Sequence, residues 1–346
     1  MKKFIIVFIC AFVSPYIFLA TFIIGVDPYY VFHRPFNMQP TKTDAPHYVA
    51  RGLIRNMDYD ILLCGTSMCE NMHTDYIDSK FGGTSIKVIQ HGSYSNDFTA
   101  SLKQAARSRQ ADIIIMGLDS AMWKKPNEGY RIEGIPDYAV NMPNLINCLP
   151  YVFNVETLIP CIQLIKENMD VNLEKMNNWW SIDEEAYGIA NVEQDWKNKK
   201  ITGYGLPESN VDLAWDNYNN LVEGIEACQS EGIMVKFFIP PYSVADFSLY
   251  DYKSDLAINK EVWRKLLQYD NVEIYAIQFD TALIQCFEWY RNVNHYNGLV
   301  CDIIIDDIAN GKLLLTEDNI DECVETFEQF LDNYDWDGLD KVLANH

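Results

Sequence analysis

Apolar and polar positions alternate in blocks along most of the chain after residue 58. Short apolar runs bounded by turn residues predict buried strands, and apolar positions three or four residues apart predict helices. The runs place strands at 60–64, 85–90, 112–116, 234–239 and 272–277. Helical spacing places helices at 68–80, 98–107, 212–230 and around 262–267. Strands that alternate with helices in this way predict a parallel sheet with helices on both faces.

The first 26 residues follow a different pattern. Lys2 and Lys3 precede an apolar stretch over 4–26, which Asp27 ends, and this length is enough to cross a bilayer core of ~30 Å. The lysines predict that the N-terminus is cytoplasmic and that the rest of the chain is extracytoplasmic, in a cell membrane contacted through residues 4–26. A cleaved signal peptide is the alternative, but Ala20 and Gly25 are poorly placed for a cleavage site. The pattern therefore favours an uncleaved, single-pass anchor.

The remaining chain divides by composition. We expect a connector at 27–58, an α/β domain at 59–314 and an acidic tail at 315–346 that is helical over 318–331. The stretch at about 123–207 interrupts the alternation of strands and helices, and it is rich in aromatic residues and asparagine. We interpret this stretch as an inserted helical or irregular lid over the carboxyl edge of the sheet.

Charge and cysteine content narrow the function. The chain has 27 Lys and Arg against 49 Asp and Glu, a net charge of −22, with no basic stripe of the kind that binds nucleic acid. Its nine cysteines are scattered and include no C-x-x-C pair, so neither a zinc site nor a dense disulfide framework is indicated. We expect Cys64, Cys228 and Cys301, which lie in apolar surroundings, to be buried thiols.

The candidate chemistry lies where the expected strands end. Ligands of parallel α/β sheets bind beyond the carboxyl ends of the strands, where Ser67, Gly92 and Asp119 stand in "GTSM", "HGSY" and "GLDS". Ser67 at a strand-to-helix turn is suited to be a nucleophile, but a plain helix N-cap is the alternative. Of the six histidines, His295 follows the last expected strand and precedes a helix. It is either the base for Ser67 or a solvated loop residue.

The order of these blocks resembles that of the SGNH/GDSL hydrolase family. The resemblance implies a flavodoxin-like, three-layer α/β/α fold with a parallel sheet. It also implies that Ser67 is the nucleophile, that His295 is the base, and that the backbone N–H groups of Ser67 and Gly92 form an oxyanion hole. When the anchor and the segments "VDPYYVFH" and "FFIPPYS" are considered together with these blocks, the chain is similar to membrane-anchored SGNH-like proteins. Examples are the DltD-type proteins of D-alanine transfer and the acetylation proteins of exopolysaccharide export.

Two positions depart from the family pattern. An oxyanion-hole Asn of the family is replaced by Asp119, whose carboxylate would oppose a developing oxyanion unless it is protonated or turned away. Asn96 is a substitute amide. The family's Asp three residues before the histidine is replaced by Asn292, which orients an imidazole but does not stabilise an imidazolium by charge. Asp280 is the candidate substitute acid, or else a helix cap.

Two functions follow and both stay open. The first is an extracytoplasmic serine esterase or O-acyltransferase that needs no metal or organic cofactor. Its partners would be an acylated cell-surface glycan or wall polymer and a membrane acyl-transfer protein. The second is a non-catalytic binding or accessory subunit that has kept the fold, in which Trp123, Trp179 and Trp180 form either a sugar platform or the core of the insertion. The order of the blocks favours the enzyme.

Overall fold

The chain folds into two compact units. In the computed structural model, unit 1 consists of Met1–Met57 and Ile132–Trp179, and unit 2 of Asp58–Arg131 and Trp180–His346. The structure describes residues 2–34, 36, 38, 46–119, 122, 129–144, 146–169, 186–203 and 211–344. The three tryptophans of the predicted sugar platform lie outside these residues. Each unit is described below by itself, and the domain boundaries drawn from the sequence stay predictions.

Unit 2 is built on a six-stranded sheet in the order β2-β1-β3-β4-β5-β6, which confirms the predicted α/β fold with a mostly parallel sheet. Every residue of β1 and β2 is buried, as expected for strands covered on both faces. β6 pairs antiparallel with β5 and was missed by the sequence pattern because it is only two residues long. The strands are β1 (Ile61–Gly65), β2 (Ser85–Ile89), β3 (Ile113–Gly117), β4 (Met234–Phe238), β5 (Val272–Tyr275) and β6 (Leu314–Leu315).

The helices of unit 2 pack against one another in several sets. α4 packs on α9, α9 on α11 and α11 on α14, whereas α3 packs on α13. Right-handed crossovers place α3 on one face of the sheet and α4, α9 and α11 on the other. The longer helices are α3 (Thr74–Phe81), α4 (Ser95–Ser108), α8 (Ile189–Thr202), α9 (Val211–Ser230), α11 (Tyr252–Leu266), α13 (Gly298–Ala309), α14 (Ile320–Asp332) and α15 (Trp336–Ala344). The short ones are η1 (Ser67–Cys69), α10 (Val244–Phe247), η6 (Ile277–Phe279), α12 (Thr281–Ile284) and η7 (Phe287–Trp289).

The predicted helix at 68–80 is wrong in its first turn. The chain forms the 3-10 turn η1 and begins the α-helix α3 only at Thr74. The physical reason is Lys87, a buried lysine on β2 whose ammonium group donates to the carbonyl oxygens of Glu70 and Met72, both at 2.9 Å. Carbonyl groups turned toward this ammonium do not accept the bonds of a continuous helix.

The strand order places a switch point beside the first strand. β2 pairs with β1 on one side, and the next strand, β3, pairs with β1 on the other side. The direction of the strand order therefore reverses between the carboxyl ends of β1 and β3. Ligands of doubly wound sheets bind at such points. Ser67 follows β1 and Asp119 follows β3 by two residues, so both stand at this edge.

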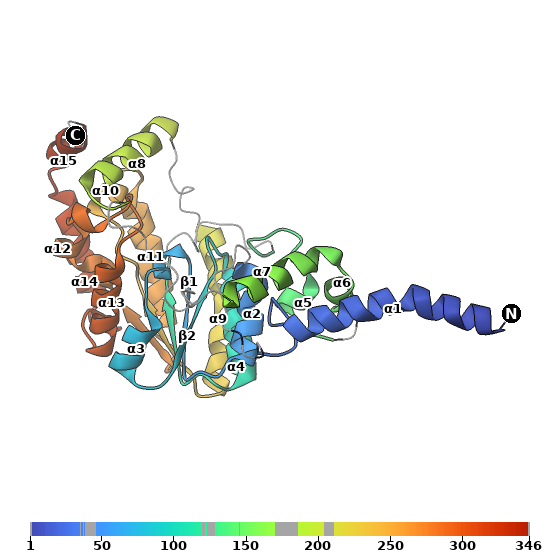
Figure 1. Cartoon of the computed structure of the whole chain (residues 1–346). Coiled ribbons are helices and arrows are strands. Elements are labelled where there is room, and N and C mark those ends of the chain that lie inside the picture. Colours follow the sequence, from blue (N-terminus) through green and yellow to red (C-terminus); the bar gives the residue numbers. More distant parts are fainter. Residues whose placement is uncertain are drawn as a thin grey trace. The chain divides into compact units, whose positions relative to one another are not determined.

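Unit 1 contains α1 (Lys2–Val26), which among the described residues is the one helix long and apolar enough to cross a membrane. α6 and α7 contact α1, and α2 contacts α5 (Figure 1). The other elements are α2 (Pro46–Asn56), α5 (Asp137–Val140), α6 (Leu149–Val152), η3 (Val155–Thr157) and α7 (Leu158–Asn168). The core of unit 1 joins the end of α1 to these helices through Ile23, Val26, Val31, Tyr138, Ala139, Cys148, Tyr151, Val152, Cys161 and Leu164.

Candidate functional site

Ser67 is the first residue of η1, directly after β1. The N-cap of this turn is Thr66, whose hydroxyl accepts from the backbone N–H of Met68 at 3.3 Å. The structure therefore assigns the capping role to Thr66 and leaves the hydroxyl of Ser67 for another contact. That contact is the imidazole of His295, with 2.8 Å between Oγ and Nε2. The two residues lie 228 positions apart in the sequence.

The turn that carries Ser67 requires the glycines of the motifs "GTS" and "GLD". Cys69 is fully buried, and its sulfur lies so close to the end of β1 that no side chain fits there, and close enough to the end of β3 to crowd one. A Cβ on Gly65 would lie 2.2 Å from this sulfur, and one on Gly117 would lie 3.3 Å from it. The two glycines thus allow the turn to fold back against the sheet and hold Ser67 at its edge.

Asn292 fixes the tautomer of His295. The Oδ1 atom of Asn292 accepts the backbone N–H groups of His295 at 2.8 Å and Asn294 at 3.0 Å. Only an oxygen accepts two N–H donors, so this atom is the oxygen and not the nitrogen of the amide. The same oxygen lies 3.1 Å from Nδ1 of His295, which must then carry the hydrogen. Nε2 is left with its lone pair facing Ser67, the arrangement that a general base requires.

The loop that carries His295 is fixed by bonds from three other segments. Ser243, at the start of α10, donates both its backbone N–H and its hydroxyl to the carbonyl oxygen of Val293, at 3.0 and 2.9 Å. Asn71, which follows η1, donates its amide to the carbonyl oxygen of Tyr296 at 2.8 Å. Asp195 on α8 accepts the backbone N–H of Val293 at 3.1 Å. The base and the nucleophile are therefore tied to one framework.

A buried carboxylate stands beside this pair. Glu70 is 3% exposed, and its two oxygens lie 3.3 Å from the guanidinium of Arg291 and 3.3 Å from Nε2 of His91. Desolvation of the imidazole and the nearby charge of Arg291 lower the pKa of His295 to about 4, against smaller opposing effects of Glu70 and Asp119. His295 is therefore neutral at ordinary pH, so its Nε2 is available to accept a proton.

The residues predicted to bind the oxyanion, Gly92, Asn96 and Asp119, differ in their contacts. Gly92 follows β2 with a φ of 61°, a left-handed conformation that glycine adopts without strain. Asn96 lies in the first turn of α4. Its side-chain NH₂ group donates to the carbonyl oxygen of Gly129 at 2.7 Å, and its side-chain oxygen accepts from the amide of Asn220. The amide of Asn96 is thus engaged elsewhere. Asp119 accepts from the hydroxyls of Tyr242 at 2.6 Å and Thr66 at 3.3 Å.

Asp280 caps a helix. Its Oδ1 accepts the backbone N–H groups of Ala282 and Leu283, both at 3.1 Å, at the start of α12. The bond at Nδ1 of His295 belongs to Asn292. Of the two roles considered for Asp280, the structure shows the cap, because its oxygen satisfies the end of α12.

Several residues that support the site were not found by sequence reasoning. Lys87 shapes the turn after Ser67, and burial lowers the pKa of its ammonium to about 8. A lysine inside the apolar strand "SIKVIQ" was the available signal. Glu70 had no comparable signal, because its contacts join segments far apart in the sequence. The segment "FFIPPYS" placed Tyr242 beyond the carboxyl end of a predicted strand, but its bond to Asp119 was not predictable from the sequence.

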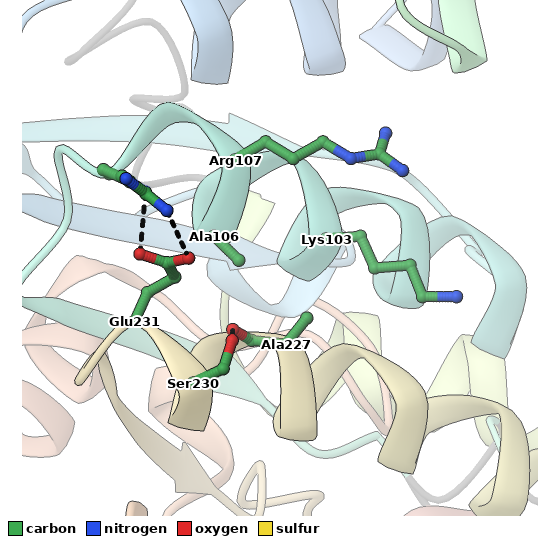
Figure 2. Close-up of a pocket in the computed structure, with 7 residues that line it drawn as sticks. Lys103, Ala106, Arg107, Ala227, Ser230 and Glu231 are labelled. Atoms are coloured by element: carbon green, nitrogen blue, oxygen red, sulfur yellow. Dashed lines mark hydrogen bonds and ion pairs between the residues drawn. The ribbon is translucent and has the colours of Figure 1, made fainter.

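A second surface feature of unit 2 lies away from this site. The hollow in Figure 2 is formed where α4 and α9 end, just before β3 and β4 begin, so it lies at the amino edge of the sheet. Arg109 pairs with Glu231 at 2.7 Å and Lys103 with Glu223 at 2.5 Å. Two of the cations in this region therefore have acidic partners. Its lining residues are Lys103, Ala106, Arg107, Arg109, Ala227, Ser230 and Glu231.

Comparison with known proteins adds no assignment. The chain matches no protein-family model and none of the curated proteins. Within the described residues, no group of three or more His, Cys, Asp or Glu side chains has the arrangement of a metal site.

Proposed function

We propose that unit 2 is a serine ester hydrolase or O-acyltransferase of the SGNH type. The observation that carries the proposal is the hydrogen-bonded series Ser67–His295–Asn292, in which backbone donors fix the tautomer of the base. The strand order β2-β1-β3-β4-β5 supports a flavodoxin-like fold, since that order defines the flavodoxin class. The position of Ser67 at the switch point supports the same conclusion.

The proposed reaction has two halves. Ser67 Oγ attacks the ester carbonyl while Nε2 of His295 takes the hydroxyl proton, and the backbone N–H groups of Ser67 and Gly92 bind the oxyanion. The imidazolium then returns the proton to the leaving alcohol, which leaves an acyl group on Ser67. Water in a hydrolase, or a sugar hydroxyl in a transferase, attacks this acyl-enzyme with the same base. Asn292 holds the imidazole in place but supplies no charge to the imidazolium.

The carboxylate of Asp119 takes a supporting role in this proposal. Both of its oxygens accept hydroxyl bonds, which draw it toward Tyr242 and Thr66. Its charge raises the pKa of His295, so it stabilises the imidazolium that forms during the reaction. Glu70 raises the same pKa more than Asp119 does, so the two carboxylates together partly replace the family acid whose position Asn292 occupies.

The cellular setting proposed from the sequence is an extracytoplasmic one, with α1 retained as the anchor. The packing of unit 1 supports retention, because Ile23 and Val26 at the end of α1 belong to its core. Removal of α1 as a signal peptide would remove these side chains from the core they complete. The substrate would be an acyl ester on a cell-surface glycan or wall polymer, with a membrane acyl-transfer protein as the partner.

A fluorophosphonate probe tests the proposal on the full-length protein. The probe should label Ser67, as mapped by peptide mass spectrometry, and the protein should hydrolyse p-nitrophenyl acetate. Ser79→Ala is the matched control. Ser79 is an exposed serine whose hydroxyl donates to the carbonyl oxygen of Tyr76, one helical turn earlier, at 2.7 Å. This control should keep both label and activity, and Ser67→Ala should lose both. A folded protein with no label at Ser67 would instead support the binding or accessory subunit, which the missing acid at Asn292 favours.

A further inference from the structure

Unit 1 contains an apolar surface in a part of the chain that has almost no charge. Between 138 and 165 the one charged residue is Glu156, where the chain average of 22% would give about six. Besides Met142 (48%), six large apolar side chains of this stretch are nevertheless exposed, all of them between 146 and 162. They are Ile146 (79%), Leu149 (43%), Phe153 (46%), Val155 (66%), Ile159 (61%) and Ile162 (58%), and we name them the apolar foot.

The foot has a regular side along η3 and α7. Val155, Ile159 and Ile162 are spaced four and three residues apart, which places them on one face of the helical segment. Cys161 and Leu164, on the other face of α7, are buried in the core of unit 1. The N-terminal half of α7 is thus apolar on both faces, and polar side chains, Gln163 and Lys166, join the exposed side only after Ile162. A helix at a water-exposed surface carries polar residues along its whole outer face.

The foot also lies beside the end of α1. α6 and α7 contact α1, and the side chains that join them include Ile23 and Val26 at its C-terminal end. Figure 1 shows α5, α6 and α7 in green next to the C-terminal part of α1 in blue. The rest of α1 exposes its own apolar side chains, among them Phe4 (74%), Phe8 (62%), Phe12 (63%) and Phe18 (74%). The two exposed apolar surfaces are therefore parts of one unit.

We propose that the apolar foot inserts into the outer interface of the lipid bilayer, next to the point where α1 leaves it. The inference rests on the anchor proposed above. Continuity selects lipid as the occupant, because the foot is packed on the last turns of the same helix that spans the hydrocarbon core. The strength with which a surface segment binds in the interfacial plane increases with the apolar area that it buries there. The protein would then be held by the span and by the foot together.

Photolabelling from within the bilayer tests the foot. The full-length protein is placed in vesicles of phosphatidylcholine and phosphatidylglycerol that contain a phosphatidylcholine with a photoactivatable acyl chain. Adducts are mapped by peptide mass spectrometry. We expect adducts in 4–18 and in 146–162, and none around Ile201, an isoleucine of unit 2 with 83% exposure.

Matched variants sharpen the result. The double variant Ile159→Ser with Ile162→Ser should lower the adducts in 146–162 by about tenfold, because it removes two inserted alkyl chains. Adducts in 4–18 should stay unchanged, which shows that the protein is still inserted. Ile201→Ser should change neither. Since all of these substitutions are at exposed positions, thermal unfolding of the variants should match that of the wild type.

Each other outcome has a distinct meaning. Adducts confined to 4–18 would overturn the foot and leave the anchor intact. A protein without adducts in either segment would overturn the anchor and the foot together. Cross-links that join 146–162 to a second copy of the chain, with no lipid adducts there, would identify a dimer surface and overturn the proposal of lipid.

Discussion

The two units of the chain differ in what they present to their surroundings. Outside α1, unit 1 exposes ten large apolar side chains among its described residues, six of them in the foot, whereas the longer unit 2 exposes five. Those of unit 2 are scattered over separate elements, which is normal for a protein in water. The contrast agrees with the two proposals made above, in which unit 1 attaches the protein to the bilayer and unit 2 carries the chemistry.

One buried ionisable residue in each unit, Asp27 in unit 1 and Lys87 in unit 2, shows the same division of roles. Unit 1 buries Asp27, which has a φ of 47° and accepts the backbone N–H groups of Val31, Phe32 and His33 and the hydroxyl of Tyr151. Desolvation nevertheless raises the pKa of this carboxyl. The charged side chain of Lys87 in unit 2 supports the turn at the candidate site. One charge thus fixes the chain as it leaves α1, and the other shapes the site.

The largest effect should come from the candidate nucleophile and base. Ser67→Ala, His295→Ala and the double variant should each lower the kcat for p-nitrophenyl acetate to background, a loss on the order of 10⁶-fold if the residues act as a unit. Steady-state kinetics with single and double variants measures this. Lipid adducts of unit 1 should not change, because none of these residues belongs to it. A double variant much slower than either single one would show that the two residues do not act together.

Asp27→Ala should break unit 1 and spare unit 2. Three backbone N–H groups and one hydroxyl lose their acceptor, so we expect a loss on the order of 4 kcal/mol in the stability of unit 1, at ~1 kcal/mol or more for each group. Hydrogen exchange over 137–168 measures it. Glu133→Ala, at an exposed acid of the same unit, is the control. If esterase activity fell together with protection in unit 1, the units would not be independent.

The sequence predicted the parts of unit 2 that follow from local pattern. The five longer strands were found because each is a short apolar run between turn residues. The contact between Ser67 and His295 agrees with the order of the motifs, and the catalytic roles of the two residues stay predictions. The turn after Ser67 was wrong, because its shape depends on Lys87 from another strand. The orientation of the Asn292 amide was not predictable, since it is set by backbone groups that only the folded loop brings together.

Unit 1 was harder to predict for a physical reason. Apolar residues at helical spacing predict a helix with a buried face, and the sequence alone does not distinguish burial in protein from burial in lipid. The stretch at 123–207 was therefore interpreted as a lid, a prediction that stays open. In the structure its residues 132–169 belong to unit 1, whose core includes the end of α1, and α8 belongs to unit 2.

A smaller effect is expected at Asn292, in opposite directions for two substitutions. An Asp-to-Asn change in a serine protease triad costs ~10⁴-fold, mainly through the wrong tautomer. Here the tautomer is already correct, so Asn292→Asp should raise kcat only by about 10- to 100-fold, through the charge it adds beside the imidazolium. Asn292→Ala removes the oxygen that accepts the Nδ1 hydrogen of His295, so the tautomer is no longer fixed and kcat should fall. Unchanged rates in both variants would exclude Asn292 from the site.

The acid limit of activity should shift with the same substitution. Because the pKa of His295 is lowered to about 4, the kcat/KM of the wild type should stay constant as pH falls to about 5 and decline only near 4. A carboxylate in Asn292→Asp should raise the pKa of the imidazole by ~1 to 2 units and move the decline to higher pH. The pH profile of kcat/KM decides this. A wild-type decline centred at the ordinary histidine value of ~6.5 would show that the ring is more hydrated than its contacts indicate.

The smallest effect is on stability, and it should have opposite signs in the two units. His295 has a lowered pKa in the folded state, so the unfolded chain takes up its proton first, and unit 2 loses stability as pH falls from 6.5 toward about 4. Asp27 has a raised pKa, so the folded state binds its proton more tightly than the unfolded chain does. This proton-linked part of the stability of unit 1 is complete below 3.8 and is lost as pH rises through the folded value. Hydrogen exchange of each unit against pH measures the two slopes.

Replacing the groups with neutral ones, in His295→Gln and Asp27→Asn, should flatten the slope of the unit that carries the substitution and leave the other slope unchanged. Slopes of equal sign in both units would mean that other groups dominate the pH dependence of stability.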